Sequence, residues 1–431
     1  MQTSAPTEDP TPDGRTAASG ARFLRVFGIV VAVVALAVGT VNVLAFRYML
    51  REDNQSIVQL LPGWGRTYKP VLYDTFKPEI AVFGASWARD AFDPLDVGKL
   101  LGRKVFNHAV SGGTAYETRR FADSALANPN LRAAIINLDT IYGREEQRTK
   151  YGFDEAVLNL NPDLTPNRWV SVSRAYSLVF TGWAIGANLD LVAAVRARER
   201  GAPLSEYLPA YEQADRAAQR EPLAAVRERI LPERAAGRTR DRDTAKPSAA
   251  KPPSPFELAA LAELELMIDR FCERGVDVYL YFTPKHMIEE DSCDPDAHLA
   301  LYTLELARRK QAMCPAKIAY YDFAYPNAVT LEGVTAPVER SVYYRPDGHP
   351  RPTVGLLMAA QMLGVNGAPD EVQRDFGVDL LRHPSPEAWL RERAARCEGV
   401  WSDEAAAALA CAAPTSAAGS AAPPAAARGP R

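Results

Sequence analysis

A serine at the end of a short apolar run is the residue in this chain best suited to chemistry. The run Ile80–Phe83 leads through Gly-Ala into Ser86, and a polar helical segment follows. A serine hydroxyl becomes a nucleophile only when a base accepts its proton and a third group holds that base. Ser86 is therefore either the nucleophile of an acyl-transfer reaction or only the cap of the following helix.

Five histidines could supply the base, and His349 is the best placed of them. It lies in "YYRPDGHPRPTVG", a loop before a helix start, with Asp347 two residues upstream. We predict that His349 is the base and that Asp347 orients it; the alternative is a surface histidine. His286, in the loop after the fourth predicted strand, is a second candidate that would contact substrate or act as base. His108 lies within a strand and is predicted to be a core residue.

A glycine pair at a strand-to-helix turn could stabilise an anion. In "FNHAVSGGTAYE", Gly112 and Gly113 follow the second predicted strand. Free amide groups at such turns point at negative charge. The N–H groups of Gly112 and Ser86 would form a two-donor oxyanion hole, with Gly113 at the rim. The alternative is an ordinary tight turn.

Asp139 ends the third predicted strand and would either orient a group of the site or cap the next turn. The cysteines show no metal-ligand spacing, and we find neither a P-loop nor a dinucleotide fingerprint. We therefore predict neither a metal nor a cofactor. The net charge of −3 and the lack of a basic patch give no indication of a nucleic-acid partner.

Alternating apolar runs and amphipathic segments must position these residues. Near-continuous apolar strands separated by helices predict an α/β fold with a parallel sheet covered on both faces. Five such strands are predicted within residues 79–86, 104–112, 132–139, 276–284 and 317–324. Ligands of such sheets bind beyond the carboxyl ends of the strands, where Ser86, Asp139 and His286 fall.

An uncharged run near the N-terminus, Val26–Phe46, has the length of a transmembrane helix. It is longer than the core of a signal peptide, so a retained anchor is favoured. We expect a single-pass inner-membrane protein whose main domain is periplasmic. The predicted organisation is a disordered N-terminus (1–25), the anchor (26–46), a linker (47–78), the first part of the α/β domain (79–145), a helical and flexible insertion (146–255), the second part of the domain (256–365), a C-terminal extension (366–410) and a disordered tail (411–431).

Two observations on this organisation leave alternatives open. The aromatic segment from Trp169 to Trp183 would dock on the membrane, cap a substrate groove or pack as an inserted subdomain. Among the five cysteines, we expect a disulfide between Cys293 and Cys314 and a buried thiol at Cys272, with Cys397 and Cys411 as a weaker second pair.

Three motifs resemble the sequence blocks of SGNH/GDSL-type hydrolases. They are "VFGASWARDAFDP", "VFNHAVSGGTAYE" and "YYRPDGHPRPTVG", and the likeness covers roughly residues 78–145 and 256–364. The resemblance implies a flavodoxin-like three-layer sandwich with Ser86 as nucleophile, His349 as base, Asp347 as its orienter and Gly112 as an oxyanion donor. It is nearest to membrane-anchored bacterial proteins of the alginate O-acetyltransferase type, which act on envelope polysaccharides.

That likeness implies an O-acyl, most simply O-acetyl, transferase or esterase. Its partners would be an acyl donor, a glycan acceptor, the inner membrane, and membrane acyltransferase or exopolysaccharide assembly proteins. Two departures from the family pattern are visible: the acid stands two residues before His349, and the third block lacks its Gly-x-Asn-Asp sequence. These departures leave open an inactive scaffold that binds glycan or assembly partners. The aromatic segment from Trp169 to Trp183 near the anchor suggests a third alternative, a lipid-directed esterase.

Overall fold

The structure is a computed structural model, in which two compact units divide the chain. One unit lies within residues 1–76 and 151–208, and the other within 77–150 and 209–431. The structure describes residues 14–49, 51, 65–141, 148–180, 182–200, 252–287, 297–332, 341–345, 348–365 and 376–400.

The second unit is built on a six-stranded, mostly parallel sheet, as the strand pattern predicts. The strands are β1 (Ile80–Phe83), β2 (Val105–Asn107), β3 (Ala133–Asn137), β4 (Asp277–Phe282), β5 (Ile318–Asp322) and β6 (Val378–Asp379). They lie in the order β2-β1-β3-β4-β5-β6, and only the short β6 is antiparallel to its neighbour. The chain passes from β1 to one side and then returns to the other side for β3, so the order of the sheet reverses at β1. This reversal is the place where open α/β sheets hold their ligands.

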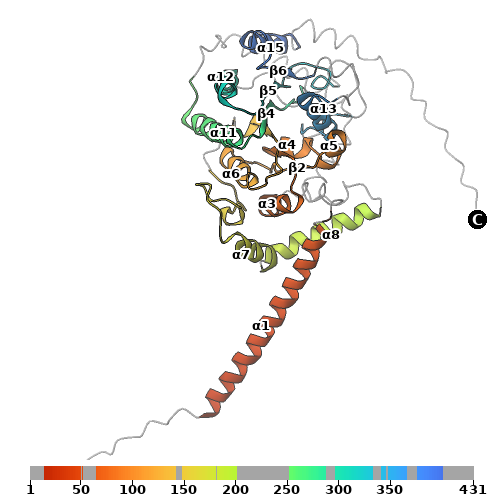
Figure 1. Cartoon of the computed structure of the whole chain (residues 1–431). Helices are drawn as coiled ribbons and strands as arrows, with labels where there is room; N and C mark the ends of the chain where they lie inside the picture. The colour runs from red at the N-terminus through yellow and green to blue at the C-terminus, as the bar shows by residue number, and fades with distance from the viewer. Residues whose placement is uncertain are drawn as a thin grey trace, which may run out of the picture. The chain divides into compact units, whose positions relative to one another are not determined.

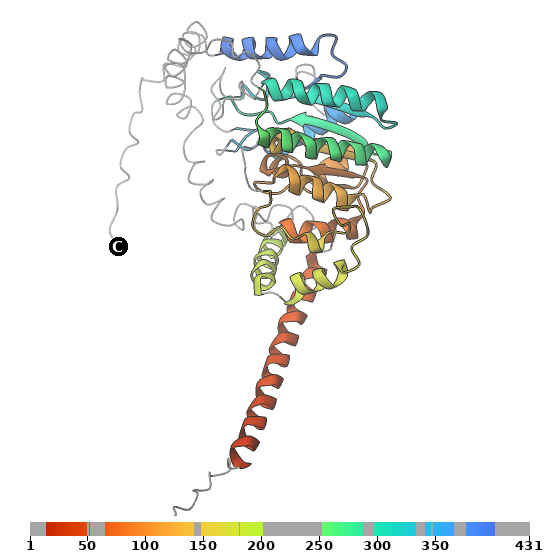
Figure 2. The ribbon, with the colours of Figure 1, turned by 90° about the vertical axis from the view of Figure 1, so that its left-hand side faces the viewer.

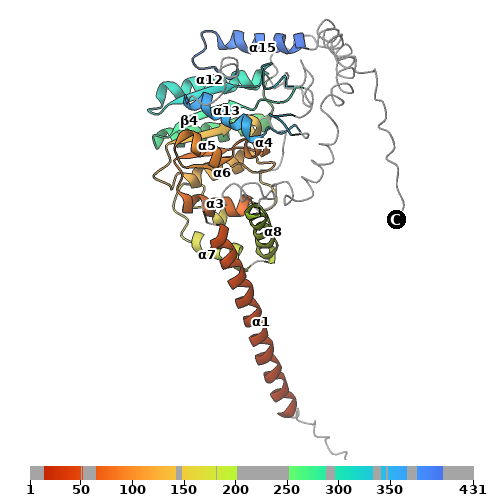
Figure 3. The same cartoon turned by 90° about the vertical axis from the view of Figure 1, so that its right-hand side faces the viewer.

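Helices cover both faces of this sheet (Figure 1). On one face lie α6 (Ala115–Ala125), α11 (Pro255–Glu273) and α12 (Ala297–Met313), seen in front of the strands in Figure 2. On the other lie α4 (Ser86–Ala91), α5 (Pro94–Leu101) and α13 (Pro352–Leu363), which face the viewer in Figure 3. The predicted C-terminal helix is present as α15 (Pro386–Val400).

Burial of the strands on both faces explains their near-continuous apolar sequence. All four residues of β1 and all five of β3 are buried. Side chains of β1, such as Ile80 and Val82, join a core cluster with Val354 and Met358 of α13. This packing joins β1, which precedes Ser86, to α13, which follows His349, although the two elements are far apart in the sequence.

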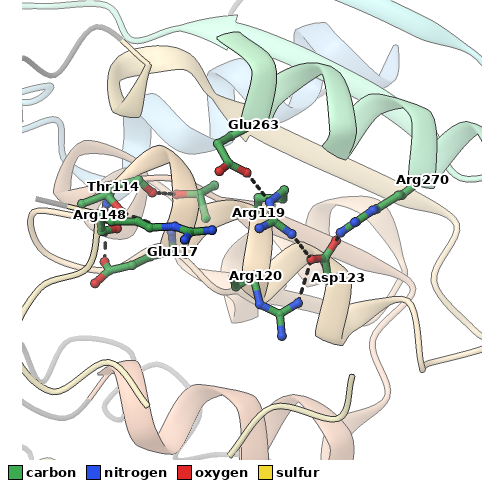
Figure 4. Close-up of polar contacts among 9 residues, drawn as sticks. Thr114, Glu117, Arg119, Arg120, Asp123, Arg148, Glu263 and Arg270 are labelled. Atoms are coloured by element: carbon green, nitrogen blue, oxygen red, sulfur yellow. Dashed lines mark hydrogen bonds and ion pairs between the residues drawn. The ribbon is translucent and has the colours of Figure 1, made fainter. Parts of the chain in front are cut away.

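A buried ion network joins α6 to α11 (Figure 4). The Asp123 carboxylate accepts from Arg119 at 2.6 Å, from Arg120 at 2.9 Å, and from Arg270 of α11. Arg119 also pairs with Glu263 of α11. Three guanidinium groups thus share one carboxylate whose side chain is 1% exposed.

The first unit contains the long apolar helix α1 (Gly14–Met49) and four further segments. These are α3 (Gly65–Phe76), the short turn η3 (Glu155–Val157), the pair α7 (Val170–Ala175) and η4 (Tyr176–Phe180), and α8 (Gly182–Glu199). Within α1, Arg22–Tyr48 is long and apolar enough to cross a membrane, slightly longer than the predicted 26–46.

The structure differs from the prediction that residues 47–78 form only a linker. Residues 65–76 form α3, in which Tyr68, Leu72, Tyr73 and Phe76 are buried. These positions recur at helical spacing and give the segment an apolar face. The Tyr68 hydroxyl also donates to Asn188 Oδ1 of α8 at 3.3 Å, so part of the predicted insertion packs with the segment that follows the anchor.

The disulfide prediction was wrong. Cys272 bonds to Cys314, with their Cα atoms 5.3 Å apart, whereas we expected Cys272 to be a free thiol and Cys314 to pair with Cys293. Cys272 lies in the last turn of α11 and Cys314 directly follows α12. The two neighbouring helices end at the same side of the sheet, which sequence spacing does not reveal. Cys293 lies outside the described residues.

Candidate active site

The structure brings together the two residues that the sequence singled out as nucleophile and base. His349 Nε2 lies 3.0 Å from Ser86 Oγ, within the range in which a base can accept a serine proton. Both side chains are half-buried, so they can be reached from solvent. Asp347, the predicted orienter, lies outside the described residues.

Ser86 is held at the carboxyl end of β1 by a close backbone approach. Gly84 has φ +153°, and a Cβ at this position would lie 2.5 Å from the Asn137 Cβ of β3. Only glycine fits such a contact. The chain then turns so that Ser86 becomes the first residue of α4. Its amide has no acceptor within the helix, because the first-turn amides of a helix have none.

Asn107 fixes the helix that carries Ser86. From the end of β2, its Nδ2 lies 2.9 Å from the Ala88 carbonyl, 3.1 Å from that of Arg89 and 2.9 Å from that of Phe92. Its Oδ1 accepts from the Ala109 amide at 3.0 Å. Asn107 therefore has a structural role, because it binds the carbonyls at the end of a six-residue helix.

A tight hairpin presents His349. The Arg345 amide donates to the His349 carbonyl at 2.8 Å, and Tyr344 bridges to Pro350. Arg345 Nη1 pairs with Asp90 Oδ2 of α4 at 3.1 Å. The hairpin that carries the base is therefore tied to the helix that begins with the nucleophile.

Asp90 also joins this site to the glycine turn. Its Oδ1 accepts from Arg89 Nε at 2.6 Å, and both side chains are buried. Arg89 Nη1 in turn donates to Ser111 Oγ, next to Gly112. One carboxylate thus binds two guanidinium groups, one directed to the histidine hairpin and the other to the turn.

The glycine turn lies against the turn that leads into Ser86. The Val110 amide donates to the Gly84 carbonyl at 3.1 Å, and a Cβ on Gly113 would lie 3.0 Å from the same oxygen. The Gly113 amide donates to the Val110 carbonyl at 3.2 Å, so it serves the turn itself. Gly112 lies in the same turn with φ +55°, and its role as an oxyanion donor stays a prediction.

Trp87 and Lys285 lie beside the proposed base, and neither was predicted from the sequence to be a site residue. The Trp87 ring stacks on His349 with centroids 4.8 Å apart. Lys285 Nζ lies 5.4 Å from the centroid of the Trp87 ring, as in a cation–π contact. The available signal was position: Trp87 follows Ser86 directly, and Lys285 lies in the loop after β4.

Asp139 belongs to a polar cluster at the ends of β3 and β4. Asn137 Nδ2 donates to Asp139 Oδ2 at 2.8 Å and to Thr283 Oγ1 at 2.7 Å, and Thr283 donates to Asp139 at 2.5 Å. Burial raises the pKa of the Tyr281 phenol in this region well above its ordinary value, and the charge of Asp139 adds to the effect. Asp139 thus has local partners that fix its position.

His286 is buried, and its Nε2 lies 2.7 Å from the Glu332 carbonyl oxygen. Its ring contacts Tyr344, with centroids 4.7 Å apart. These contacts favour a structural role beneath the histidine hairpin. His108 is buried between the rings of Phe83 and Phe121. Within the described ranges, no group of three or more His, Cys, Asp or Glu could hold a metal ion.

Comparison with protein-family models, with curated proteins and with solved structures gives no match.

Proposed function

We propose that this protein is a serine-dependent O-acyltransferase or esterase of the SGNH type, which acts on O-acyl, most simply O-acetyl, groups of a cell-envelope or exported polysaccharide. The observation that carries the proposal is the 3.0 Å approach of His349 Nε2 to Ser86 Oγ. A serine and a histidine at this distance, at the carboxyl edge of a parallel sheet, are the elements of nucleophilic acyl transfer.

In the first half-reaction, Ser86 Oγ attacks the acyl carbonyl carbon while His349 Nε2 takes the hydroxyl proton. A tetrahedral oxyanion forms, and the amides of Ser86 and Gly112 stabilise it. The bond to the leaving group then breaks, and His349 returns the proton to the departing oxygen. The product is an acyl ester on Ser86.

In the second half-reaction, His349 takes a proton from a sugar hydroxyl or from water, and the resulting oxygen attacks the acyl-serine. Collapse of the second tetrahedral species releases Ser86 with its proton restored. Transfer to sugar makes the protein an acyltransferase, and transfer to water makes it an esterase. Each step uses only protein side chains and backbone.

Two features support a periplasmic placement of the second unit. In the part of the chain that the structure describes, the helical segment Arg22–Tyr48 is long and apolar enough to anchor the protein in a membrane. The Cys272–Cys314 disulfide lies in the second unit, and disulfides persist in oxidising compartments such as the periplasm. A polysaccharide substrate would be met on that side of the inner membrane.

The test is a comparison of full-length variants in detergent with p-nitrophenyl acetate as donor and with O-deacetylated polysaccharides as acceptors. We expect nitrophenol release that Ser86→Ala abolishes and His349→Ala slows strongly. The matched controls Ser171→Ala and His383→Gln, which replace the same residue types far from Ser86 in the sequence, should retain it. Acetylated glycan would identify a transferase, and free acetate an esterase.

Release that is unchanged in Ser86→Ala would refute a serine mechanism. Binding of polysaccharide without any Ser86-dependent turnover would instead support the inactive scaffold.

A further inference from the structure

The described side chains of helix α1 are exposed along most of its length and become buried only near its C-terminal end. From Arg22 to Ala37 the described side chains are exposed, and the first buried residue is Gly39. About 20 helical residues cross a hydrocarbon core of about 30 Å. A core that begins at Phe23 therefore ends near Asn42.

Polar contacts within the first unit begin at this same level. The buried Asn42 donates through Nδ2 to the Val179 carbonyl of η4 at 2.8 Å, and its Oδ1 accepts from Asn188 of α8 at 2.7 Å. Six residues further along α1, Tyr48 donates to Glu199 of α8 at 2.6 Å. Because both helices lead from the Asn42–Asn188 pair toward the Tyr48–Glu199 pair, α8 runs away from the bilayer boundary. The segment that precedes α8, α7 with η4, thus lies at the boundary.

This segment carries large exposed aromatic and apolar side chains at helical spacing. Trp169 is 72% exposed, Val172 60% and Tyr176 65%. The spacing i, i+3, i+7 places the three on one side of the helical run, which we call the α7 face. Arg168, next to Trp169, is also exposed. Figures 1 and 3 both show α7 beside the C-terminal end of α1.

We propose that the α7 face lies in the interfacial region of the bilayer that α1 crosses, with lipid headgroups and upper acyl chains as its partner. Trp and Tyr are enriched at that depth, because their rings are apolar and their tips polar. Arg168 would meet anionic lipid headgroups. The segment lies against α1 through η4, whose Val179 carbonyl accepts from Asn42. The proposal stands independently of the catalytic one.

The test places the full-length chain in nanodiscs of phosphatidylethanolamine and phosphatidylglycerol whose acyl chains are brominated near the headgroup. Bromine quenches the fluorescence of tryptophans in contact with it. We expect Trp169→Phe to lose a lipid-quenched component of the emission, and the control Trp87→Phe, in the second unit, to retain it. The double variant Trp169→Phe/Val172→Trp should restore the component, because position 172 lies on the same face.

Aqueous iodide supplies the opposing outcome. If Trp169 is quenched by iodide and not by brominated lipid, the α7 face is open to water or belongs to a protein partner, and the proposal is overturned. The double variant Trp169→Phe/Val172→Trp controls for the possibility that Trp169→Phe disorders α7. A disordered α7 would not regain lipid quenching through a tryptophan at position 172.

Discussion

His349 Nε2 and Ser86 Oγ lie 3.0 Å apart although 263 residues separate them in the sequence. Ser86 is fixed by the end of β1 and the start of α4, and His349 by a hairpin that ends where α13 begins. Since α13 packs against α4 and α5, the distance between the two side chains is set by the core of the second unit. Helix packing in this core therefore holds the two side chains at the distance that the proposed chemistry requires.

Asp90 is predicted to position the base. In Asp90→Asn, one oxygen acceptor remains, but both Arg345 and Arg89 lose the charge that holds them. Because the Arg345 backbone bonds to His349, the imidazole should shift, and we expect kcat with p-nitrophenyl acetate to fall by roughly 10²-fold with little change in KM. The control Asp96→Asn removes an exposed carboxylate of α5 that pairs with Lys99, and it should act like the wild type. An equal loss in both variants would contradict a positioning role.

The network of Figure 4 makes a prediction about stability. Asp123→Asn removes the carboxylate that Arg119, Arg120 and Arg270 share, although Arg119 keeps its pair with Glu263. Removing one partner of a buried ion pair costs about 3–5 kcal/mol. Hydrogen exchange of the α6 and α11 amides in the full-length chain should report this loss. Glu392→Gln, which breaks the exposed pair with Arg396, should change the opening free energy by less than about 1 kcal/mol. Unchanged protection in Asp123→Asn would show that the network contributes nothing net.

The disulfide predicts both a chemical and a thermodynamic result. Under denaturing, non-reducing conditions, the peptides of Cys272 and Cys314 should be found linked, and they should accept a thiol label only after reduction. The bond closes a loop with a sequence separation of 42, for which the chain-entropy model gives about 4 kcal/mol. Cys272→Ser/Cys314→Ser should destabilise the second unit by about that amount. Free labelling of Cys272 in the full-length protein purified without a reductant would refute the pairing.

Asp93 predicts a dependence of stability on pH. Its Oδ1 accepts from the Leu95 amide at 2.8 Å as the cap of α5, and burial raises the pKa of its carboxyl above the ordinary 3.8. A carboxyl with a raised pKa contributes stability below its unfolded pKa, and this contribution is lost as the pH rises through the folded pKa.

Asp93→Asn keeps an acceptor and cannot ionise, so the opening free energy of the α5 amides should lose this dependence and should not fall at pH 7. Asp93→Ala removes the cap and should lie about 1 kcal/mol below Asp93→Asn. Hydrogen exchange measured across the acidic range distinguishes the two variants. Equal opening free energies of the α5 amides in the two variants would show that the side-chain cap does not stabilise α5.

The sequence predicted the strands and helices better than the side-chain contacts between them. Runs such as Ile80–Phe83 are apolar because both faces of the sheet are covered, so the five parallel strands could be read directly. The pairing of Ser86 with His349 was also predictable, because strand ends and loops before helices meet at one edge of a parallel sheet. The residue-level match to the SGNH pattern remains a proposal.

Side-chain partners that depend on packing were missed. Cys314 bonds to Cys272 because α11 and α12 end side by side, and no spacing rule contains that distance. The Arg345–Asp90 pair and the stack of Trp87 on His349 likewise join segments whose approach is decided by the tertiary fold. Helix α3 was read as a linker, since its apolar side chains become a face only when a partner covers them.

The central claim is that Ser86 carries the acyl group, and an acyl-enzyme measurement tests it most directly. The full-length protein would be mixed with p-nitrophenyl acetate, quenched in acid, and examined by intact mass and peptide mapping. We predict one added acetyl group per chain, located on Ser86, absent from Ser86→Ala and formed far more slowly in His349→Ala. An acetyl group that forms equally in Ser86→Ala, or no adduct and no Ser86-dependent release with any acyl ester, would contradict the account.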